Sequence, residues 1–385
     1  MDSGSVLLAT GLLEYEGLST QGLSLNDLCG FGARNNARRG FVFVSRVLGK
    51  HLPCPAVRMT AAQALLAGEI APDAGSTIFV GMAETATGLG HGVFEAHLRA
   101  RPSPSAYFQT TRYLLSGARA IEFEEEHSHA TRQFLYAPET DELRRLVRAA
   151  RNLVLIDDEA STGTTFANLV RALRPEMPDL ATVTGLVLTD FSDGAAQRAL
   201  QRAAPGLRAS VAALWQGRYR FEPSRRPLPP GLPAQAGTLQ CQRQGSSAYT
   251  ARLGTTTPVP AFDPHELRAL VAPGQSVLVV GTGECMHAAC VLASAFDAIG
   301  ARGSVQSTTR SPLLVGHDVR SALMVDDPYG EGVANYLYNF QAGDFDACLV
   351  VHEGTDMMAA QRLASRLGAH RIGLMGEPVR QSCPE

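Results

Sequence analysis

Short runs rich in apolar and β-branched residues recur along the chain, separated by segments with helical spacing. Runs of this kind are typical of strands that are buried on both faces of a parallel sheet. In the segments between them, apolar residues recur three and four positions apart, as on one face of a helix. The pattern therefore predicts an α/β protein in which strands and helices alternate. The predicted strands include 78–80, 153–156, 183–188, 277–280, 322–325 and 348–351, and the predicted helices include 141–147, 288–299 and 359–367.

The alternation is interrupted between 223 and 260, where proline is frequent and apolar residues lack regular spacing. This composition predicts a linker with at most short local structure. A chain of 385 residues is also long enough for two domains. We therefore predict a first α/β domain over 1–222, a Pro-rich linker over 223–260 and a smaller second α/β domain over 261–385.

Composition narrows the class of protein further. The chain is 45% hydrophobic and 18% charged, and its net charge of −3 gives no overall field that favours nucleic acid. The seven cysteines are scattered and odd in number, which favours a reducing cytoplasm over a disulfide framework. Cys285 and Cys290, with His287 between them, lack the spacing of a zinc knuckle.

The sequence also bears on location and partners. We see neither a basic segment followed by an apolar leader nor an apolar run approaching the roughly 20 residues of a membrane span. We expect a cytoplasmic homodimer whose partners are small molecules rather than nucleic acid or membrane.

Residues 153–165 carry the strongest functional signal. An apolar strand ends in Asp157 and Asp158, and a loop of small, hydroxylated residues follows. The next segment has helical spacing, so a helix begins beneath the loop and adds its positive dipole end. Backbone N–H groups and hydroxyls in such a loop can hold a phosphate. The expected phosphate ligands are Ser161, Thr162, Gly163, Thr164 and Thr165.

Other phosphate motifs fit this loop less well. A Walker loop needs a lysine after its last glycine, but Thr164 follows Gly163. A dinucleotide fingerprint needs three spaced glycines, and this loop has one. Two acids directly before the loop would repel a lone phosphate, whereas a neighbouring ribose could donate hydrogen bonds to both carboxylates. The pattern therefore indicates a phosphorylated sugar.

Residues 153–165 resemble the phosphoribosyl-diphosphate (PRPP) signature of type I phosphoribosyltransferases. The resemblance implies a parallel sheet flanked by helices, with Asp157 and Asp158 on the ribose hydroxyls and 161–165 on the 5′-phosphate. It also implies Mg²⁺, which commonly rests on substrate oxygens and one or two carboxylates. Asp157 and Asp158 are the residues expected to hold the metal, either directly or through water or substrate. Catalysis would depend on positioning, charge compensation and exclusion of water.

In enzymes of this type a second loop binds the diphosphate, and it corresponds here to Gly81, Met82, Ala83 and Glu84. Glu84 departs from the pattern, because a basic or small residue would suit diphosphate better. This carboxylate could instead hold Mg²⁺.

A flexible hood carrying basic residues to the diphosphate is also implied, between 107–112 and 121–131. Arg112 and His129 are the expected catalytic residues there, and His127 and Arg132 are further candidates. The His-x-His spacing also fits a metal site on a strand, and the whole segment could be a solvated charged hairpin.

A strand-like segment near the amino terminus is framed by basic residues, Arg38 and Arg39 before it and Lys50 and His51 after it. It could cap the active site and select the acceptor base. An exposed basic surface is an equal alternative.

Polar loops follow three predicted strands of the second block, at 281–284, 306–312 and 325–332. Loops at successive strand ends should converge on one sheet edge. Arg310, flanked by hydroxyls, suits an anion. A second or acceptor site is therefore possible at Thr309, Arg310, Ser311, Asp326 and Asp327.

The tetrapeptide Thr309-Arg310-Ser311-Pro312 resembles the signature of the TRSP domain. TRSP domains follow a phosphoribosyltransferase domain in proteins of bacterial tellurite-resistance and stress operons. The resemblance implies a second, smaller Rossmann-like α/β domain, and a two-part enzyme that makes a nucleotide-like metabolite.

Three functions stay open from the sequence. The leading one is Mg²⁺-dependent transfer of ribose 5-phosphate from PRPP to a nucleobase-like acceptor, such as orotate, a purine or an unusual base, with release of diphosphate. The second is a non-catalytic PRPP- or nucleotide-sensing regulator, which the departure at Glu84 keeps open. The third is a phosphatase or hydrolase in the second block that uses Asp326 and Asp327.

Overall fold

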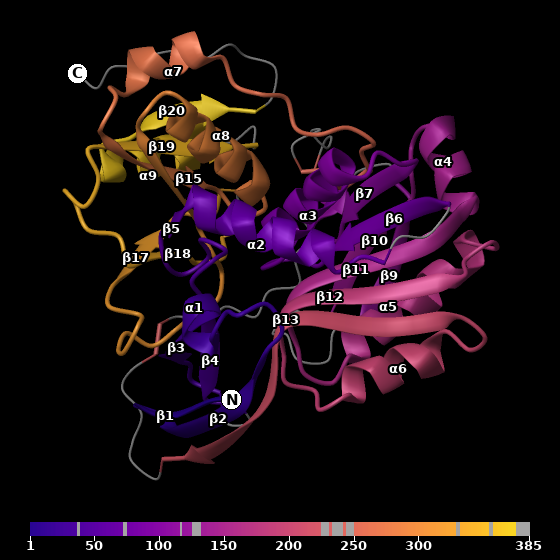
Figure 1. Ribbon diagram of the computed structural model, residues 1–385. Helices are drawn as coiled ribbons and strands as arrows, with labels where there is room; N and C mark the ends of the chain where they lie inside the picture. The colour runs from indigo at the N-terminus through magenta and orange to yellow at the C-terminus, as the bar shows by residue number, and fades with distance from the viewer. Residues whose placement is uncertain are drawn as a thin grey trace.

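The computed structural model has two α/β lobes, each built on its own sheet, with α2 (Ala56–Gly68) and α3 (Thr87–Ala100) lying between them (Figure 1). The structure describes residues 1–36, 39–71, 75–115, 118–124, 132–224, 231–232, 242–243, 250–328, 332–353 and 357–374.

The first lobe is built on a seven-stranded sheet of described residues, in the order β1-β2-β13-β12-β11-β6-β7. The five strands from β13 to β7 are parallel, and the β1–β2 hairpin adds to β13 in antiparallel fashion. The sheet thus has the parallel arrangement that the apolar runs predict. Its strands are β1 (Asp2–Leu8), β2 (Gly11–Ser19), β6 (Ser76–Gly81), β7 (Ser105–Gln109), β11 (Ala150–Ala160), β12 (Thr182–Asp190) and β13 (Arg208–Pro223).

Helices cover both faces of this sheet because the side chains of each strand alternate between the faces. Phe79 of β6 contacts Phe94 of α3, with ring centroids 5.6 Å apart. Its neighbour Val80 faces the other way, into a cavity that Leu173 also lines. The second face carries α4 (Asp141–Arg148), α5 (Thr164–Leu173), the 3-10 turn η1 (Arg174–Glu176) and α6 (Ala195–Ala203).

Small elements surround the carboxyl edge of this sheet. A hairpin of β3 and β4 follows the short helix α1, and a second hairpin pairs β9 with β10. Their bounds are α1 (Leu25–Leu28), β3 (Cys29–Ala33), β4 (Phe41–Ser45), β8 (Leu114–Leu115), β9 (Ala120–Glu124), β10 (Arg132–Tyr136) and β14 (Gln242–Arg243).

The second lobe has a five-stranded sheet in the order β20-β19-β15-β16-β5. The first four strands are parallel, and β5 (Cys54–Pro55) pairs antiparallel with β16. An N-terminal segment is therefore part of the second sheet, while the domain limits given above stay a prediction. The other elements are α7 (Pro264–Leu270), β15 (Ser276–Gly281), α8 (Met286–Ala298), β16 (Arg302–Ser307), β17 (Ala322–Val325), β18 (Asn335–Tyr338), β19 (Ala347–His352), α9 (Met357–Leu367) and β20 (His370–Gly373).

Two strands differ from the sequence expectation. The strand predicted at 153–156 continues to Ala160, because β12 still pairs with it after the pairing with β6 ends at Ile156. The strand predicted at 322–325 is not part of the five-stranded sheet, since β17 pairs with β18 in a separate hairpin. Only Val325 of this strand is buried, so its apolar run does not mark a strand covered on both faces.

A buried ionic network joins the lobes, and it begins inside the segment predicted as a linker. Arg252 is fully buried, and its Nε and Nη1 atoms lie 2.6 Å and 2.7 Å from carboxylate oxygens of Glu284 and Glu353. Glu284 also accepts hydrogen bonds from Gln109, the last residue of β7 in the first sheet, and from Thr111, two residues further on. The loop after β15 is therefore held against the carboxyl edge of the first sheet.

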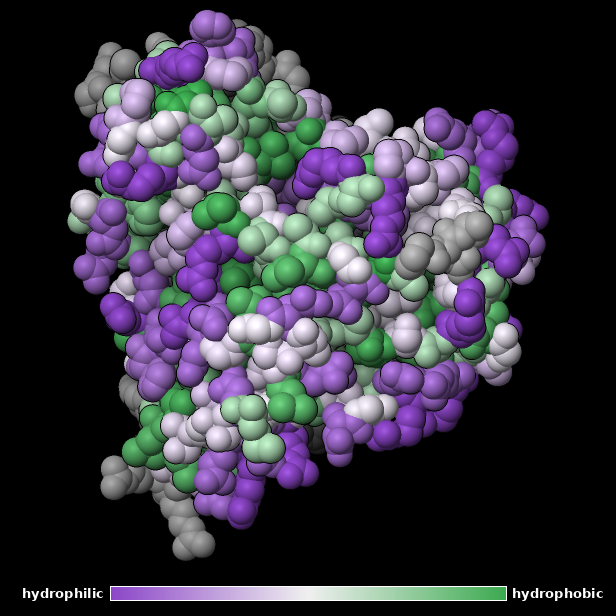
Figure 2. All heavy atoms as spheres, in the orientation of Figure 1, coloured by the Kyte–Doolittle hydropathy of each residue, from purple (hydrophilic) through white to green (hydrophobic). Residues whose placement is uncertain are grey.

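On the face shown in Figure 2, hydrophobic side chains gather over α2 between the lobes, among hydrophilic ones. Within the described residues, every helix is too short or too polar to cross a lipid bilayer.

We predict that Arg252→Ala lowers the free energy of unfolding by about 3–5 kcal/mol, because two carboxylates stay buried without their cation. Chemical denaturation measures the change. Arg268→Ala is the control, since Arg268 is exposed on α7 and its removal should change stability by less than about 0.5 kcal/mol. Equal unfolding midpoints for the two variants would contradict a structural role of the network.

Candidate active site

The acid pair lies at the carboxyl edge of the first sheet, where β6 has ended and β11 continues. Asp157 is paired with Val187 of β12, and the N–H of Met82 donates to the carbonyl of Ile156 at 2.9 Å. The predicted diphosphate loop therefore begins directly beside the first acid of the pair. Ligand sites of open α/β sheets lie at such an edge.

Three successive carboxylates make this edge strongly negative. The N–H of Asp158 donates to Oδ1 of Asp157 at 2.9 Å, and Glu159 follows on the same strand. Burial raises the pKa of Asp158 and the negative charge of Glu159 raises it further, against the lowering effects of the Asp157 hydrogen bond and of Arg39. The edge thus favours groups that donate hydrogen bonds or carry positive charge.

Arg39 compensates the third acid. Its Nη2 lies 2.6 Å and 2.7 Å from the two carboxylate oxygens of Glu159, and its guanidinium lies 4.9 Å from the ring centre of Phe41. Burial lowers the pKa of Arg39, but the charge and hydrogen bond of Glu159, together with Tyr219 and Asp158, raise it above its usual value. The N-terminal segment is thereby fixed beside the acid pair, as a cap would be. Arg38 lies outside the described residues.

The loop predicted to bind phosphate leads into α5. Gly163 has a left-handed φ of +73°, and a Cβ atom there would meet Cα of Ala196 at 2.5 Å, so only glycine fits without a backbone shift. The hydroxyl of Thr162 donates to that of Thr164 at 3.0 Å. Thr164 and Thr165 form the first turn of the helix, and Phe166 begins its buried side. The N–H groups of a helix start are thus part of the loop.

Side chains of the next strand and hairpin hold the second predicted loop, 81–84. The N–H of Ala83 donates to the hydroxyl of Thr110 at 2.7 Å, and the amide of Gln133 donates to the carbonyl of Ala83 at 3.1 Å. The peptide bond between Ala83 and Glu84 is cis. The N–H and the carbonyl of Ala83 therefore both have fixed partners within the protein.

Three cations surround Glu84. Its Oε1 lies 2.8 Å from Nζ of Lys50, which is only 3% exposed. Burial raises the pKa of Glu84, but the charges of Lys50, Arg112 and Arg310 together lower it to about 2. A group of three cations, called the basic pocket below, thus lies around Glu84 at the loop 81–84. The cations come from the N-terminal segment, from the residues after β7 and from the second domain.

Arg310 reaches this pocket from the second domain. Its Nη2 donates to the hydroxyl of Tyr113 at 2.8 Å, and its guanidinium lies 4.8 Å from the centre of that ring. Thr309 precedes it in a short bridge, exchanging backbone hydrogen bonds of 2.9 Å and 2.7 Å with Tyr336. The hydroxyl of Thr309 accepts from the N–H of Ser311 at 3.2 Å. The loop 309–312 therefore faces the first sheet.

The two acids predicted in the second block point to different partners. Asp327 is buried, with a carboxylate oxygen 3.7 Å from Arg310. Asp326 is half exposed and pairs with Arg362 of α9. Asp327 therefore meets Arg310 as expected, whereas Asp326 does not, because its carboxylate pairs with α9 instead.

His51 is buried beside Lys50 and its ring centre lies 5.7 Å from that of Tyr338. Burial lowers its pKa to about 3, and the charge of Lys50 adds to that effect. The imidazole is thus uncharged at neutral pH and adds no charge to the pocket. His127 and His129 lie outside the described residues, and of Arg132 only the backbone, at the start of β10, is described.

Sequence reasoning did not single out Thr110, Tyr113 or Gln133, which shape the pocket. For Thr110 the available signal was the polar run 110–112, directly after the buried strand β7. It marks a strand end where side chains turn toward a site.

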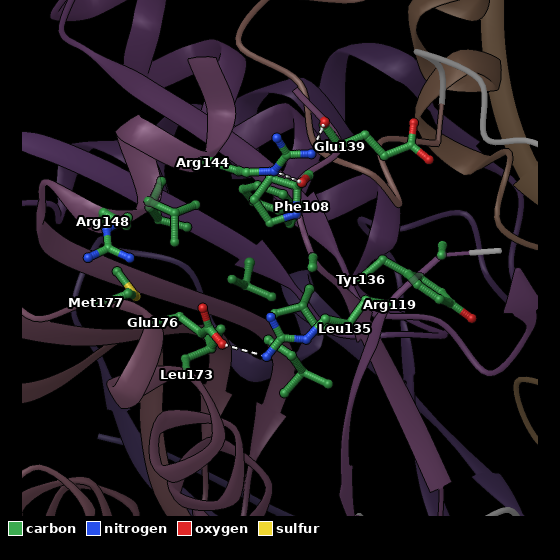
Figure 3. A pocket seen from close by; sticks show the side chains of 17 residues that line it. Phe108, Arg119, Leu135, Tyr136, Glu139, Arg144, Arg148, Leu173, Glu176 and Met177 are labelled. Atoms are coloured by element: carbon green, nitrogen blue, oxygen red, sulfur yellow. Dashed lines mark hydrogen bonds and ion pairs between the residues drawn. The ribbon is translucent and has the colours of Figure 1, made fainter. Parts of the chain in front are cut away.

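A separate cavity of about 450 Å³ lies on the face of the first sheet that α4 and α5 cover, beside the β9–β10 hairpin (Figure 3). Apolar side chains such as Phe108 and Leu135 line it, and an ion pair of 2.9 Å between Arg119 and Glu176 lies beside it. None of the predicted site residues lines this cavity.

Comparison with protein-family models matches residues 28–218 to "Phosphoribosyl transferase" and residues 250–367 to "TRSP domain C terminus to PRTase_2". No curated protein matches the chain.

Several solved structures are similar in part. Adenine phosphoribosyltransferase from Trypanosoma brucei is 12% identical, covering 49% of this chain and 77% of its own, with a TM-score of 0.34. The adenine phosphoribosyltransferase of Thermoanaerobacter pseudethanolicus is 12% identical over 49% of this chain and 96% of its own, also with a TM-score of 0.34. Orotate phosphoribosyltransferase from Aeropyrum pernix is 21% identical, covering 48% of this chain and 87% of its own, with a TM-score of 0.28.

The fold, the acid pair and the matched family model define a phosphoribosyl transferase, which is a class of transferase enzymes. The chain belongs to the family in which this domain is followed by a TRSP domain.

We predict that Gly163→Ala destabilises the protein more than Gly206→Ala. Both positions have a left-handed φ, +73° and +82°, so both substitutions cost about 1–2 kcal/mol of backbone strain. Only the new Cβ at 163 would strike backbone atoms, of Ala196, whereas the space at Gly206 is open. The excess cost should be about 1–3 kcal/mol in the free energy of unfolding. Equal values for the two variants would show that the loop can move aside.

Proposed function

We propose that the protein transfers the ribose 5-phosphate of PRPP to a nucleobase-like acceptor and releases diphosphate, in an Mg²⁺-dependent reaction. One observation carries the proposal: the acid pair lies between a phosphate loop at a helix start and a basic pocket at 81–84, all on one sheet edge. PRPP has the matching order of groups, a 5′-phosphate, a ribose diol and a diphosphate.

In this proposal each part of PRPP meets groups of suitable chemistry. Backbone N–H groups and hydroxyls of 161–165 bind the 5′-phosphate. Asp157 and Asp158 accept hydrogen bonds from the two ribose hydroxyls. The diphosphate lies against the loop 81–84, with Lys50, Arg112 and Arg310 supplying positive charge. The cations around Glu84 support this last assignment.

The reaction needs little covalent help from the protein. The bond between the anomeric carbon and the diphosphate oxygen breaks, and the electron pair leaves with the diphosphate. A nitrogen lone pair of the acceptor forms the new bond to that carbon, and the acceptor loses its N–H proton. Side chains that hold the sugar and the diphosphate on opposite sides of the breaking bond accelerate such a step through positioning and charge.

The residues fit Mg²⁺. Asp157, Asp158 and Glu159 supply hard oxygen donors, and Arg39 compensates only the last of these three acids directly. Bound there, Mg²⁺ would neutralise charge on the departing diphosphate. Asp157 and Asp158 are the residues proposed to hold it, directly or through water and substrate. Glu84 has a different role in this proposal: as the counter-ion of the buried Lys50, it compensates the charge of that side chain before substrate enters.

The acceptor stays open among orotate, a purine and an unusual base. Arg39, beside the acid pair and against Phe41, is proposed to border its site. The link to a nucleotide-like metabolite of tellurite or stress response rests on the family resemblance alone. A cytoplasmic homodimer belongs to the same proposal; the thiols of Cys29, Cys54, Cys290 and Cys348 are free, which is in keeping with a reducing compartment.

The alternatives predict different outcomes of one assay. The wild-type protein is incubated with PRPP, Mg²⁺ and a panel of orotate, adenine, guanine and uracil, and diphosphate release is measured. Turnover of any base supports the transferase. Binding of PRPP without turnover of any base would favour the sensing role, since the same groups would bind the ligand. A phosphatase built on Asp326 and Asp327 loses support because their carboxylates have different partners.

We predict that the double variant Asp157→Asn, Asp158→Asn lowers kcat/KM for PRPP by at least about a hundredfold, the scale seen when a preorganised polar group is removed from an active site. The amides keep the shape but lose the negative charge that the diol and Mg²⁺ require. Asp179→Asn, an exposed residue after η1, should leave the rate unchanged. Full activity of the double variant would overturn the assigned role of the pair.

We predict that Arg310→Gln weakens PRPP binding by roughly 10- to 150-fold, the equivalent of about 1.5–3 kcal/mol for a hydrogen bond to a charged group. Ribose 5-phosphate lacks the diphosphate, so its affinity should be unchanged. Calorimetric titration of both ligands makes the comparison, and melting temperatures report any loss of the Tyr113 contact.

Arg320→Gln is the control for this prediction, because Arg320 is an exposed arginine of the same segment. An equal loss for PRPP and ribose 5-phosphate would assign Arg310 a structural role instead.

A further inference from the structure

A cluster of ionisable side chains is buried between the domains, on helices rather than at the sheet edge. His91 and Glu95 lie four residues apart on α3, so they share one face of the helix. His287 lies in the first turn of α8, which packs against α3. The three residues are 0%, 6% and 4% exposed, respectively.

Their ligand-capable atoms are close together. Nε2 of His287 lies 2.8 Å from Oε1 of Glu95, and Nε2 of His91 lies 3.9 Å from the same oxygen. All three residues offer an atom within 4.8 Å of the others. Around a tetrahedral ion with bonds of roughly 2.0–2.1 Å, neighbouring ligand atoms lie roughly 3.4 Å apart. The two distances to Glu95 fall on either side of that value, so small side-chain rotations would complete the geometry.

The hydrogen bonding of the cluster is incomplete among the described residues. Neither ring nitrogen of His91 has a hydrogen-bond partner there, and Nδ1 of His287 has none either. The ring of His91 stacks on Tyr107 at 4.6 Å and on His287 at 4.1 Å, so aromatic faces rather than polar groups surround it. A fully buried imidazole without a partner is rare in proteins and calls for a ligand.

We propose that His91, Glu95 and His287 bind a divalent transition-metal ion of the zinc class, which fastens the two domains to each other. Two imidazoles and one carboxylate are a recognised zinc ligand set, and imidazole favours zinc over the harder magnesium or calcium ions. The N–H of Val259 donates to Oε1 of Glu95 at 2.8 Å and would orient the carboxylate from outside the ligand set.

The neighbouring side chains limit which further ligand the ion can have. Cys290 lies one turn after His287 on α8, but its sulfur is not in the group of ligand atoms that His91, Glu95 and His287 form, so a water molecule is the fitting fourth ligand. The site is separate from the acid pair and from Mg²⁺, and it does not depend on the proposed transfer reaction. Its role is structural, because it links α3, which follows the diphosphate loop, to the second domain.

The test uses the full-length protein, dialysed against a chelator and titrated with Zn²⁺. We expect one bound ion per chain and a higher melting temperature with Zn²⁺ than without it. Replacement by Co²⁺ should give the visible absorption of a four-coordinate site with nitrogen and oxygen ligands. These readouts are independent of enzymatic activity.

His91→Gln and His287→Gln should each weaken Zn²⁺ binding by at least roughly tenfold, since even partners outside the ligand set contribute that much. His97→Gln is the matched control, because His97 is a buried histidine of the same helix that contacts Ser103 instead. The proposal is overturned if the wild type retains no stoichiometric Zn²⁺, or if both variants bind it as the wild type does. If a variant fails to fold, the wild-type stoichiometry and Co²⁺ spectrum still decide the outcome.

Discussion

The buried guanidinium of Arg252 is the interaction on which the arrangement of the two domains depends. It lies between the carboxylates of Glu284 and Glu353, and all three groups are almost completely removed from solvent. Such a group of charges is costly to desolvate, and each member is stable only while the others are present. The main contribution of these three charges is therefore to fix how the two domains are arranged. Glu284 also accepts a hydrogen bond from Thr111, two residues after β7 ends, so the charges fix one sheet edge against the other.

This constraint explains why the basic pocket contains residues from distant parts of the sequence. Thr111 precedes Arg112 and Tyr113, and the hydroxyl of Tyr113 accepts from Arg310 of the second domain. Lys50 lies a few residues before β5, which is a strand of the second sheet. Once the edges are docked, cations from three segments face the same loop. A domain that only followed the first one on a flexible tether would not hold them at fixed distances.

The sequence predicts the local parts of the site and misses the parts that depend on docking. Asp157, Gly163 and the buried face of α5 follow from a strand, a turn and a helix that are contiguous in the chain, so local pattern was sufficient. Arg252 lies in the segment 223–260, which was predicted to be a linker. The sequence does not mark this residue, because a single buried side chain leaves no periodic signal. His287 was set aside together with the cysteines near it, whereas its partners lie on α3, almost 200 residues earlier. Pairings of this kind are a property of the tertiary structure.

The helix α3 connects both features of the domain boundary. It begins at Thr87, three residues after Glu84, and its next turns carry His91 and Glu95 against α8. The basic pocket is complete only when the domains are docked, because Arg310 and Lys50 belong to segments fixed by the second sheet. An anion that binds all of these cations therefore binds the docked arrangement better than any undocked one, and by linkage it stabilises docking to the same extent. Whatever strengthens the contact of α3 with α8 in turn favours the complete pocket, so interface and active site are energetically one unit.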